Sequence, residues 1–387
     1  MLRVCLVTGS RAEYGLLRPV IAALKAEQGM IVSLVVTAMH LSPEFGLSIG
    51  EIEADGHRID ARVEMLLSSD SGVGVAKSMG LGTIGLADVF ARIAPDIIIL
   101  FGDRFETLAA AQSALVMRIP VAHVSGGHVT HGAFDDAIRH SITKMSHIHF
   151  ATTEEAGLRI RQLGEDTANI HVVGDPGIDA IRLTKRLAKP AVEERLGFRL
   201  LSRNVLVTFH PVTLDPIPSV QQFENLLTAL DSLGPNMGII LTKPNADVEG
   251  RSLGALAEDF AAGRPNAICR SSLGHLLYLS TMAEVDVVIG NSSSGLLEAP
   301  SLEKPAVNIG MRQSGRPRAA SVIDCPADAR AIGDAIQRAF RLDCRGVVNP
   351  YGDGHAAERI LAVLKMTRDP QALLYKRFRD LPPTNSR

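Results

Sequence analysis

Residues 4–25 read VCLVTGSRAEYGLLRPVIAALK and predict a buried strand followed directly by an amphipathic helix. The first five residues form an apolar run without alternation, which is typical of a strand covered on both faces of a parallel sheet. The helix has an apolar face whose members recur at helical spacing: Leu16, Leu17, Val20, Ile21 and Leu24. A strand, a tight turn and a helix in this order predict a doubly wound α/β domain.

The same rhythm repeats along the chain and restarts after a charged interruption. Strand-like runs lie at 31–37, 97–101, 121–124, 149–152 and 170–173, and again at 205–209, 238–241, 267–269, 285–289 and 306–309. Between them, residues 183–202 are rich in charge and contain a proline, as expected for a linker. The sequence therefore predicts two Rossmann-like domains, the first at 1–182 and the second beginning at 183.

Composition and charge exclude several classes of partner. The 387 residues include 46% hydrophobic but only 4% aromatic residues and no Trp, and the formal net charge is -2. Nucleic acid is therefore not an expected partner, because base-stacking platforms and a basic field are both lacking. The four cysteines are scattered, and neither a signal-peptide pattern nor an apolar run of about 18 residues is evident. We expect a cytoplasmic protein that does not bind membranes.

A segment of small residues, GNSSSG at 290–295, follows a predicted strand and opens a short helix. In open parallel sheets, ligands bind beyond the carboxyl ends of strands, and free N–H groups at a helix start bind phosphate. Ser292 and Ser293 add hydroxyl donors, although one serine there would also serve as an ordinary N-cap. Glu298 has a carboxylate suited to a ribose diol, and it is also favourable near a helix start.

Two other segments that follow strands carry candidate ligands. Arg312, Arg316 and Arg318 lie within seven residues, and their guanidinium groups could bind a diphosphate or form a solvated basic loop. His210 ends a predicted strand and precedes a proline. Its imidazole could donate to phosphate or transfer a proton near neutral pH, or it could be purely structural.

Three common kinds of site are disfavoured. Four histidines lie close in sequence, but their spacing matches no metal motif: His123, His128, His131 and His140. Gly80, Gly82 and Gly85 match GxGxxG, but they lie inside a helical pattern, which argues against a nicotinamide dehydrogenase. The phosphate-binding motif GxxxxGK followed by Ser or Thr is absent. We therefore expect neither a metal nor an organic cofactor.

Five phrases together resemble one family in the right order along nearly the whole chain: TGSRAEYGLL at 8–17, GDRFE at 102–106, DDAIRHSITKMS at 135–146, GNSSSGLLE at 290–298 and NIGMRQSGR at 308–316. The chain resembles the hydrolysing UDP-N-acetylglucosamine 2-epimerases of sialic-acid and legionaminic-acid pathways. The resemblance implies a GT-B-like fold with its active site in the interdomain cleft. It also implies a second domain at 183–365, a last helix at about 366–382 that packs back on the first domain, and a homodimer or homotetramer.

The reaction implied by the resemblance is anti elimination of UDP to give a glycal, followed by addition of water, without a cofactor. Elimination needs a base for the C2 proton and donors that neutralise the leaving diphosphate. The acid/base candidates are Asp103, Asp135 and His210. By the resemblance, the residues that bind the UDP-sugar are Arg11, Arg104, His210, Ser292 and Ser293 at the diphosphate, Glu298 at the ribose and Arg312 on the nucleotide side of the cleft, together with Gly295.

One motif departs from the family pattern. Where relatives read HxxGGE, this chain reads HVSGGH at 123–128, so His128 replaces a glutamate and Ser125 stands where some relatives carry another. We expect His128 to take over part of the proton transfer. A UDP-2,4-diacetamido-2,4,6-trideoxyglucose substrate, a GDP sugar, a GT-B glycosyltransferase and a non-catalytic sugar-nucleotide binder stay open as alternatives.

Overall fold

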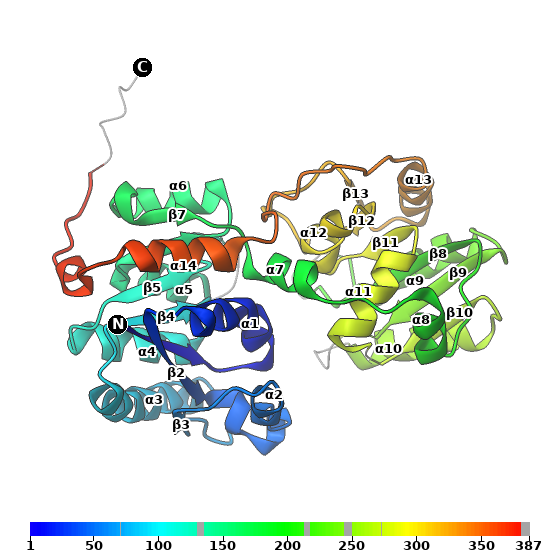
Figure 1. Cartoon of the computed structure of the whole chain (residues 1–387). Helices are drawn as coiled ribbons and strands as arrows, with labels where there is room; N and C mark the ends of the chain where they lie inside the picture. Colours follow the sequence, from blue (N-terminus) through cyan, green and yellow to red (C-terminus); the bar gives the residue numbers. More distant parts are fainter. Residues whose placement is uncertain (70, 130–134, 213–216, 244–249, 272, 381–387) are drawn as a thin grey trace. The chain divides into compact units, whose positions relative to one another are not determined.

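The computed structural model of the chain describes residues 1–69, 71–129, 135–212, 217–243, 250–271 and 273–380. The chain divides into two compact units, of which unit 1 comprises Met1–Ala180 with Gly354–Arg387 and unit 2 comprises Ile181–Asp353. The division falls within a helix, α7 (Pro176–Leu183). Each unit is built around one parallel sheet with helices beside it (Figure 1).

Unit 1 contains a seven-stranded parallel sheet in the order β3-β2-β1-β4-β5-β6-β7. Its strands are β1 (Leu2–Thr8), β2 (Met30–Thr37), β3 (Ala61–Val63), β4 (Ile97–Phe101), β5 (Val121–Val124), β6 (Ile148–Ala151) and β7 (Ile170–Val172). Its helices are α1 (Arg11–Ala26), α2 (Ile49–Ala54), α3 (Gly72–Ile93), α4 (Phe105–Val116), α5 (Asp135–Met145), α6 (Glu154–Gln162) and α14 (Ala356–Met366). The sequence analysis located every strand of this sheet except the three-residue β3.

The central strand β1 is buried on both faces, as its continuous apolar run predicts. Val4 and Leu6 pack in one cluster with residues of α1 and α14, whereas Cys5 and Val7 pack in another with residues of α3 and α4. Alternate side chains of a strand point to opposite faces, so β1 contributes to both layers of the core. This double burial confirms the predicted doubly wound α/β class.

Helix α3 is long and apolar. Among the described helices it is the one whose length and composition would suffice for a membrane span, with a window of mean hydropathy 1.2. This run was not predicted. A helix in the core of a globular domain passes the same test, and Leu86 and Phe90 of α3 are fully buried in unit 1. The GxGxxG match of Gly80, Gly82 and Gly85 lies inside α3, so it is not a strand-to-helix phosphate turn.

The last helix, α14, lies earlier in the chain than predicted. It occupies Ala356–Met366, whereas 366–382 was expected, and it packs beside α1 in unit 1. Its first turn is held by the Asp179 carboxylate, which accepts hydrogen bonds from the N–H groups of Ala356 and Ala357 at 2.9 and 2.8 Å. The following Pro370 begins a short 3₁₀ turn, because proline fixes φ and lacks an N–H donor.

Unit 2 contains a six-stranded parallel sheet in the order β10-β9-β8-β11-β12-β13. Its strands are β8 (Arg203–Thr208), β9 (Met237–Thr242), β10 (Ala267–Arg270), β11 (Val287–Gly290), β12 (Ala306–Ile309) and β13 (Val322–Cys325). Its helices are α8 (Lys189–Leu196), α9 (Ser219–Asp231), α10 (Gly250–Ala262), α11 (Gly274–Glu284), α12 (Ser294–Leu297) and α13 (Ala329–Ala339). The four-residue β13 was not predicted.

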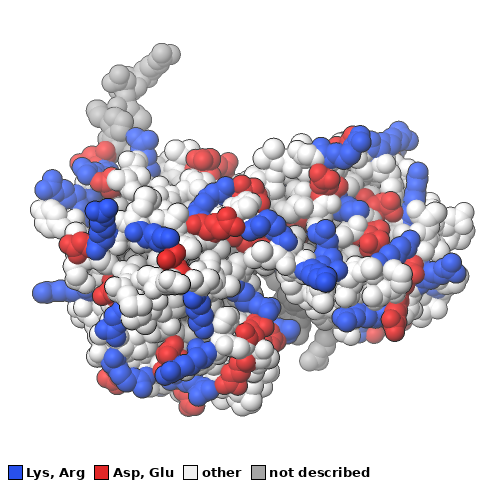
Figure 2. All heavy atoms as spheres, viewed as in Figure 1, with Lys and Arg blue, Asp and Glu red and all other residues white. Residues whose placement is uncertain are grey.

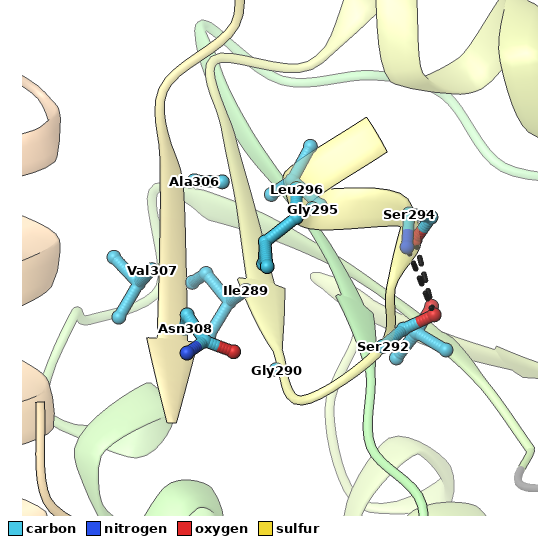
Figure 3. A pocket seen from close by; sticks show the side chains of 11 residues that line it. Ile289, Gly290, Ser292, Ser294, Gly295, Leu296, Ala306, Val307 and Asn308 are labelled. Carbon is cyan, nitrogen blue, oxygen red and sulfur yellow. Dashed lines mark hydrogen bonds between the residues drawn. The ribbon is translucent and has the colours of Figure 1, made fainter. Parts of the chain in front are cut away.

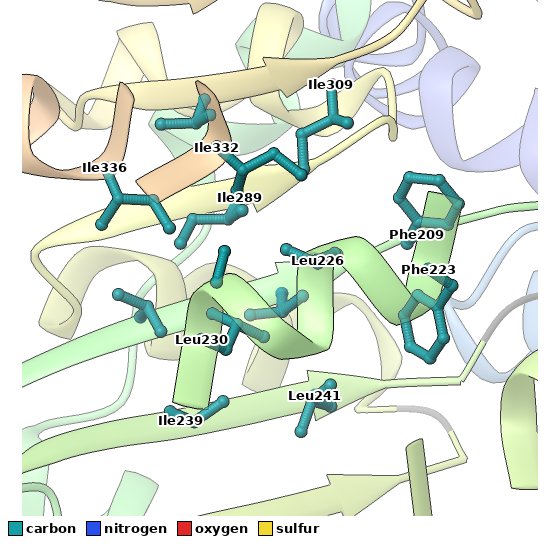
Figure 4. Close-up of a cluster of buried hydrophobic side chains, with 14 of the residues drawn as sticks. Phe209, Phe223, Leu226, Leu230, Ile239, Leu241, Ile289, Ile309, Ile332 and Ile336 are labelled. Atoms are coloured by element: carbon teal, nitrogen blue, oxygen red, sulfur yellow. The ribbon is translucent and has the colours of Figure 1, made fainter. Parts of the chain in front are cut away.

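The core of unit 2 lies on both faces of this sheet. On one face, Phe223 and Leu226 of α9 and Ile336 of α13 pack over Ile239 and Ile289 of the strands (Figure 4). On the other face, α8 and α11 bury a second cluster. The predicted linker at 183–202 is therefore partly structural, because Val192 and Leu196 of α8 are fully buried in this cluster.

Candidate functional site

A buried group of charged residues gathers where β1 and β4 end in unit 1. Arg104 follows β4, and its Nε donates to Glu106 Oε1 at 2.5 Å. The carboxylate of Glu13, on α1, accepts a hydrogen bond from the Gly9 N–H at 2.8 Å. Burial, together with repulsion by Glu106, raises the pKa of Glu13 to about 8, although two backbone hydrogen bonds and Arg104 act against it. The carboxyl of Glu13 therefore binds a proton more readily than an ordinary glutamate. Glu106 holds the Arg104 guanidinium in place.

A second network lies beside it and is centred on Arg139 of α5. This side chain is 7% exposed and pairs with the carboxylates of Asp103 and Asp136. Its Nη1 also donates to the carbonyl oxygen of His128 at 2.8 Å. Arg139 thereby ties two of the predicted catalytic residues together, although the sequence analysis assigned it no role.

Asp135 begins α5 and belongs to the same electrostatic group. Burial raises the pKa of its carboxyl, and the negative charge of Asp103 raises it further, whereas Arg104 and Arg139 lower it. A carboxylate with a raised pKa binds protons more readily than an ordinary aspartate. Asp103, Arg104 and Asp135 are thus close enough for their charges to influence one another.

His128 lies at the end of the β5 loop and is held at both its ring and its backbone. Its Nε2 lies 2.5 Å from Thr152 Oγ1, and its carbonyl accepts from Arg139. The loop before it needs glycine at Gly127, which has φ of 78° and would place a Cβ only 2.2 Å from the Ala156 carbonyl oxygen. The loop conformation is therefore set by packing within unit 1, and it fixes the position of His128.

The remaining predicted residue of unit 1, Arg11, lies apart from this network. It begins α1, pairs with Glu51 at 2.8 Å, and its side chain is 71% exposed.

A metal site was disfavoured for the four histidines that lie close together in sequence. His123 is fully buried between Thr143 and the Gly102 carbonyl, burial lowers its pKa to about 3, and His131 lies outside the described residues. Within the described part of the chain, no cluster of His, Cys, Asp or Glu is suited to a metal ion.

In unit 2, Asn291 connects two of the predicted residues, His210 and Arg312. Its side-chain oxygen accepts from the His210 N–H at 2.7 Å, and its amide donates to the His210 carbonyl at 2.8 Å. The Asn291 carbonyl accepts from Arg312 at 3.2 Å and from Gln313 at 2.9 Å. Gly290 before it has φ of 138°, and a Cβ there would lie 1.9 Å from the Thr208 carbonyl oxygen. This buried asparagine therefore locks the loops after β8, β11 and β12 together.

The three serines that follow Asn291 form a hydroxyl-rich turn, of which Figure 3 shows Ser292 and Ser294. Ser292 Oγ accepts from both the N–H and the hydroxyl of Ser294, at 3.4 and 3.2 Å. Ser293 occupies the N-cap position of α12 but makes no side-chain capping bond, so the simple N-cap interpretation does not hold. The pocket beside the turn has a volume of only about 10 Å³, room for one water. A phosphate would thus meet the outer edge of the turn.

The other candidates of unit 2 are placed around this turn. Gly295 is buried on α12 beside Ala306, and Glu298 ends α12 near Tyr278. Helix α12 has only four residues, so its dipole is small. The serine hydroxyls would therefore contribute more than the dipole to the binding of a phosphate. Of the three arginines after β12, Arg318 pairs with Asp324 at 2.6 Å.

The charge on the surface is mixed. In the view of Figure 2, Lys and Arg side chains alternate with Asp and Glu over both units, and no continuous basic field is visible on this face. This pattern agrees with the near-zero net charge. The cationic side chains discussed above occur singly: Arg104 and Arg312 follow β4 and β12, and Arg139 lies within α5.

The chain is similar over almost its whole length to known proteins. A sequence model of the family described as UDP-N-acetylglucosamine 2-epimerase matches residues 22–365. The chain is 35% identical to the GDP/UDP-N,N'-diacetylbacillosamine 2-epimerase (hydrolyzing) of Campylobacter jejuni over 98% of this chain and 99% of that protein. It is 34% identical to the UDP-N,N'-diacetylbacillosamine 2-epimerase (hydrolyzing) of Legionella pneumophila, over 94% of this chain and 95% of that one.

The fold is shared with solved structures as well. The crystal structure of UDP-GlcNAc 2-epimerase from Neisseria meningitidis, bound to UDP-GlcNAc, superposes with a TM-score of 0.76 at 21% identity. The match covers 94% of this chain and all of that one, which confirms the predicted two-domain, GT-B-like α/β fold. The family match spans most of the chain, and two relatives exceed 30% identity at nearly full length. The chain belongs to the UDP-N-acetylglucosamine 2-epimerase family.

Proposed function

We propose that the protein is a hydrolysing 2-epimerase that converts a UDP-activated N-acetylamino sugar and water into UDP and a free sugar inverted at C2. The observation that carries this proposal is the full-length similarity to relatives described as hydrolysing 2-epimerases. The charged networks of unit 1 and the hydroxyl turn of unit 2 supply the chemistry that such a reaction needs.

The first half of the reaction is an anti elimination. A base takes the C2 proton, the electrons of that C–H bond form the C1–C2 double bond, and the C1–O bond breaks to release UDP. We assign the base to Asp135, because its raised pKa favours proton uptake. Arg104, His210, Ser292 and Ser293 donate to the departing diphosphate, Arg312 holds the nucleotide and Glu298 its ribose.

The second half adds water across the glycal. One proton reaches C2 from the face opposite to the one that lost it, and the hydroxyl binds C1, so the free sugar is inverted at C2. His128 and Asp103 are the proposed partners for these proton transfers, since Arg139 holds both. Arg11 is proposed as a further diphosphate ligand. It must then leave Glu51, an exposed pair that costs little to break.

Two substrates fit the proposal. UDP-N-acetylglucosamine is supported by the family and by the ligand of the Neisseria structure. UDP-N,N'-diacetylbacillosamine, which is UDP-2,4-diacetamido-2,4,6-trideoxyglucose, is favoured by the names of the relatives at 35% and 34% identity, and its GDP form by one of them. Incubation of the purified protein with each sugar nucleotide, followed by detection of free nucleotide and of the released sugar, tests the function. Release of no nucleotide from any of them would refute it.

His128 provides a specific test of the second half-reaction. We expect His128→Gln to lower turnover about 10²-fold, because the amide cannot exchange a proton with the sugar. His128→Glu should restore part of the turnover and shift the pH profile to lower pH, measured between about pH 5.5 and 9. His171→Gln on β7 is the matched control and should change little. Turnover of His128→Gln within a few-fold of wild type would mean that Asp103, Asp135 and His210 suffice.

We also propose that the protein is a homodimer or homotetramer in the cytoplasm. Helix α3 exposes Val73, Leu81 and Ile84 by 66%, 43% and 67%, a stripe at helical spacing that suits contact with a second copy. Light scattering should give a dimer or tetramer mass, and Ile84→Glu should reduce that mass. A monomer mass for the wild-type protein would exclude the proposed oligomer.

The four free cysteines suit a reducing compartment such as the cytoplasm, which cell fractionation would check.

A further inference from the structure

A row of hydroxyl groups in close contact crosses unit 2 and ends at the serine turn. Thr242 Oγ1 lies 2.7 Å from Thr208 Oγ1, and Thr208 Oγ1 lies 3.3 Å from the Tyr278 hydroxyl. The Tyr278 hydroxyl in turn lies 2.7 Å from Ser294 Oγ, which donates to Ser292 Oγ at 3.2 Å. These groups come from β8, β9, α11 and the turn after β11, so the row connects the sheet to the turn.

The positions of the protons along this row follow from its two ends. At the inner end, Thr242 donates to the Val207 carbonyl at 3.3 Å and can accept from Thr208. At the outer end, Ser294 donates its only hydroxyl proton to Ser292 Oγ. In the contact between Tyr278 and Ser294 the donor is therefore Tyr278. No proton then remains for the 3.3 Å contact between Thr208 and Tyr278, so the ordered hydrogen bonds run from Tyr278 through Ser294 to Ser292.

Because Ser292 accepts from Ser294 and does not donate to it, the hydroxyl proton of Ser292 is available for another acceptor. Ser292 Oγ already accepts two hydrogen bonds from Ser294, and within the described part of the chain its hydroxyl donates to no other group. A hydroxyl whose oxygen accepts from neighbouring donors is polarised and becomes a better donor itself. Its remaining function is thus donation outward from the turn, where an anionic oxygen would accept.

We propose that Tyr278 is a positioning residue for the diphosphate: by donating to Ser294 it directs the Ser294 proton to Ser292 and the Ser292 proton to a phosphate oxygen. The inference rests on the proposed function, since it assigns the phosphate contact to Ser292. Tyr278 itself does not touch the substrate in this arrangement. It acts through Ser294, and its aromatic ring comes from α11, an element for which the sequence analysis assigned no role.

The surroundings of Tyr278 keep it a donor at any pH at which the enzyme would work. Burial, and then the negative charge of Glu298, raise the pKa of Tyr278 to about 12, although its contacts with Ser294 and Thr208 act in the opposite direction. The phenol consequently stays protonated well above neutral pH. The orientation of the hydroxyl row therefore does not change with pH in the physiological range.

The test is a double-mutant cycle on UDP binding, read by calorimetry. Tyr278→Phe keeps the ring and removes only the hydroxyl, and we expect it to weaken UDP binding about three- to tenfold. Ser294→Ala should weaken binding by a similar factor. Because both act on the same proton of Ser292, the double variant should bind UDP no more weakly than Ser294→Ala alone.

The control is Tyr351→Phe, which removes another buried tyrosine hydroxyl of unit 2, one that donates to the Pro317 carbonyl at 3.2 Å, and which should leave UDP binding unchanged. Unchanged affinity of Tyr278→Phe, or losses that add up in the double variant, would overturn the inference while leaving the proposed function intact. No binding of UDP by the wild-type protein would overturn both. Should Tyr278→Phe fail to fold, unchanged affinity of Ser294→Ala alone would still refute the inference.

Discussion

Replacement of Arg139 by Met should both destabilise the folded protein and nearly abolish turnover. The Arg139 side chain is 7% exposed and neutralises two carboxylates, Asp103 and Asp136, while it also donates to the His128 carbonyl. Removal of one partner of a buried ion pair leaves the other charges without compensation. We expect the free energy of unfolding to fall by about 3 kcal/mol, measured by urea denaturation.

The expected loss of turnover follows from the displacement of the catalytic groups that Arg139 holds in place. Catalytic groups displaced by about 1 Å lose about 10²-fold in rate, and Arg139 holds both Asp103 and the backbone of His128. Arg139→Lys should recover part of the stability but little of the rate, because an ammonium group lacks the planar fork. Arg62→Met, which breaks an exposed pair with Glu53, is the control and should cost less than about 1 kcal/mol. An Arg139→Met protein as stable and active as wild type would mean that the network is incidental.

The sequence predicted the fold well because the relevant signals are local. The apolar runs of β1 and β8 and the helical periodicity of α1 are complete within their own segments. The two strands that were missed, β3 and β13, have only three and four residues, and the burial of either is incomplete. The last helix lies at Ala356–Met366, whereas 366–382 was predicted: its apolar periodicity stops at Leu364, and Pro370 follows.

The sequence could suggest site residues mainly where they follow a strand. Asp103 and Arg104 follow β4 in unit 1 and His210 follows β8 in unit 2, and the carboxyl ends of parallel strands are where such sheets bind ligands. Arg139 and Tyr278 lie inside helices, where their spacing is that of any helical polar residue. Their partners lie 36 and 16 positions away, at Asp103 and Ser294. Such pairs arise from tertiary packing and leave no trace in the local pattern.

Replacement of Asp135 by Asn should cost turnover without costing stability. If Asp135 removes the C2 proton, the amide cannot replace it, and turnover should fall by about 10² to 10⁴-fold. Burial and Asp103 raise the pKa of Asp135, so the folded protein prefers its protonated form. The stabilising contribution of such a group is present below its ordinary pKa and is lost as pH rises through the raised one. At neutral pH, therefore, the neutral Asn should keep or increase the melting temperature.

The pH dependence gives the same assignment a second test. A base must be ionised to act, so kcat/KM of the wild-type enzyme should fall as pH decreases through the pKa of Asp135, at higher pH than an unperturbed aspartate would give. The neighbouring carboxylate provides the matched control: Asp136→Asn also removes a charge from the first turn of α5, and it should lower turnover far less. Comparable losses in the two variants, or a wild-type profile without this acidic limb, would assign the proton abstraction to another group. A loss of turnover confined to Asp135→Asn, with an unchanged or higher melting temperature, is the combination that a catalytic base predicts and a structural carboxylate does not.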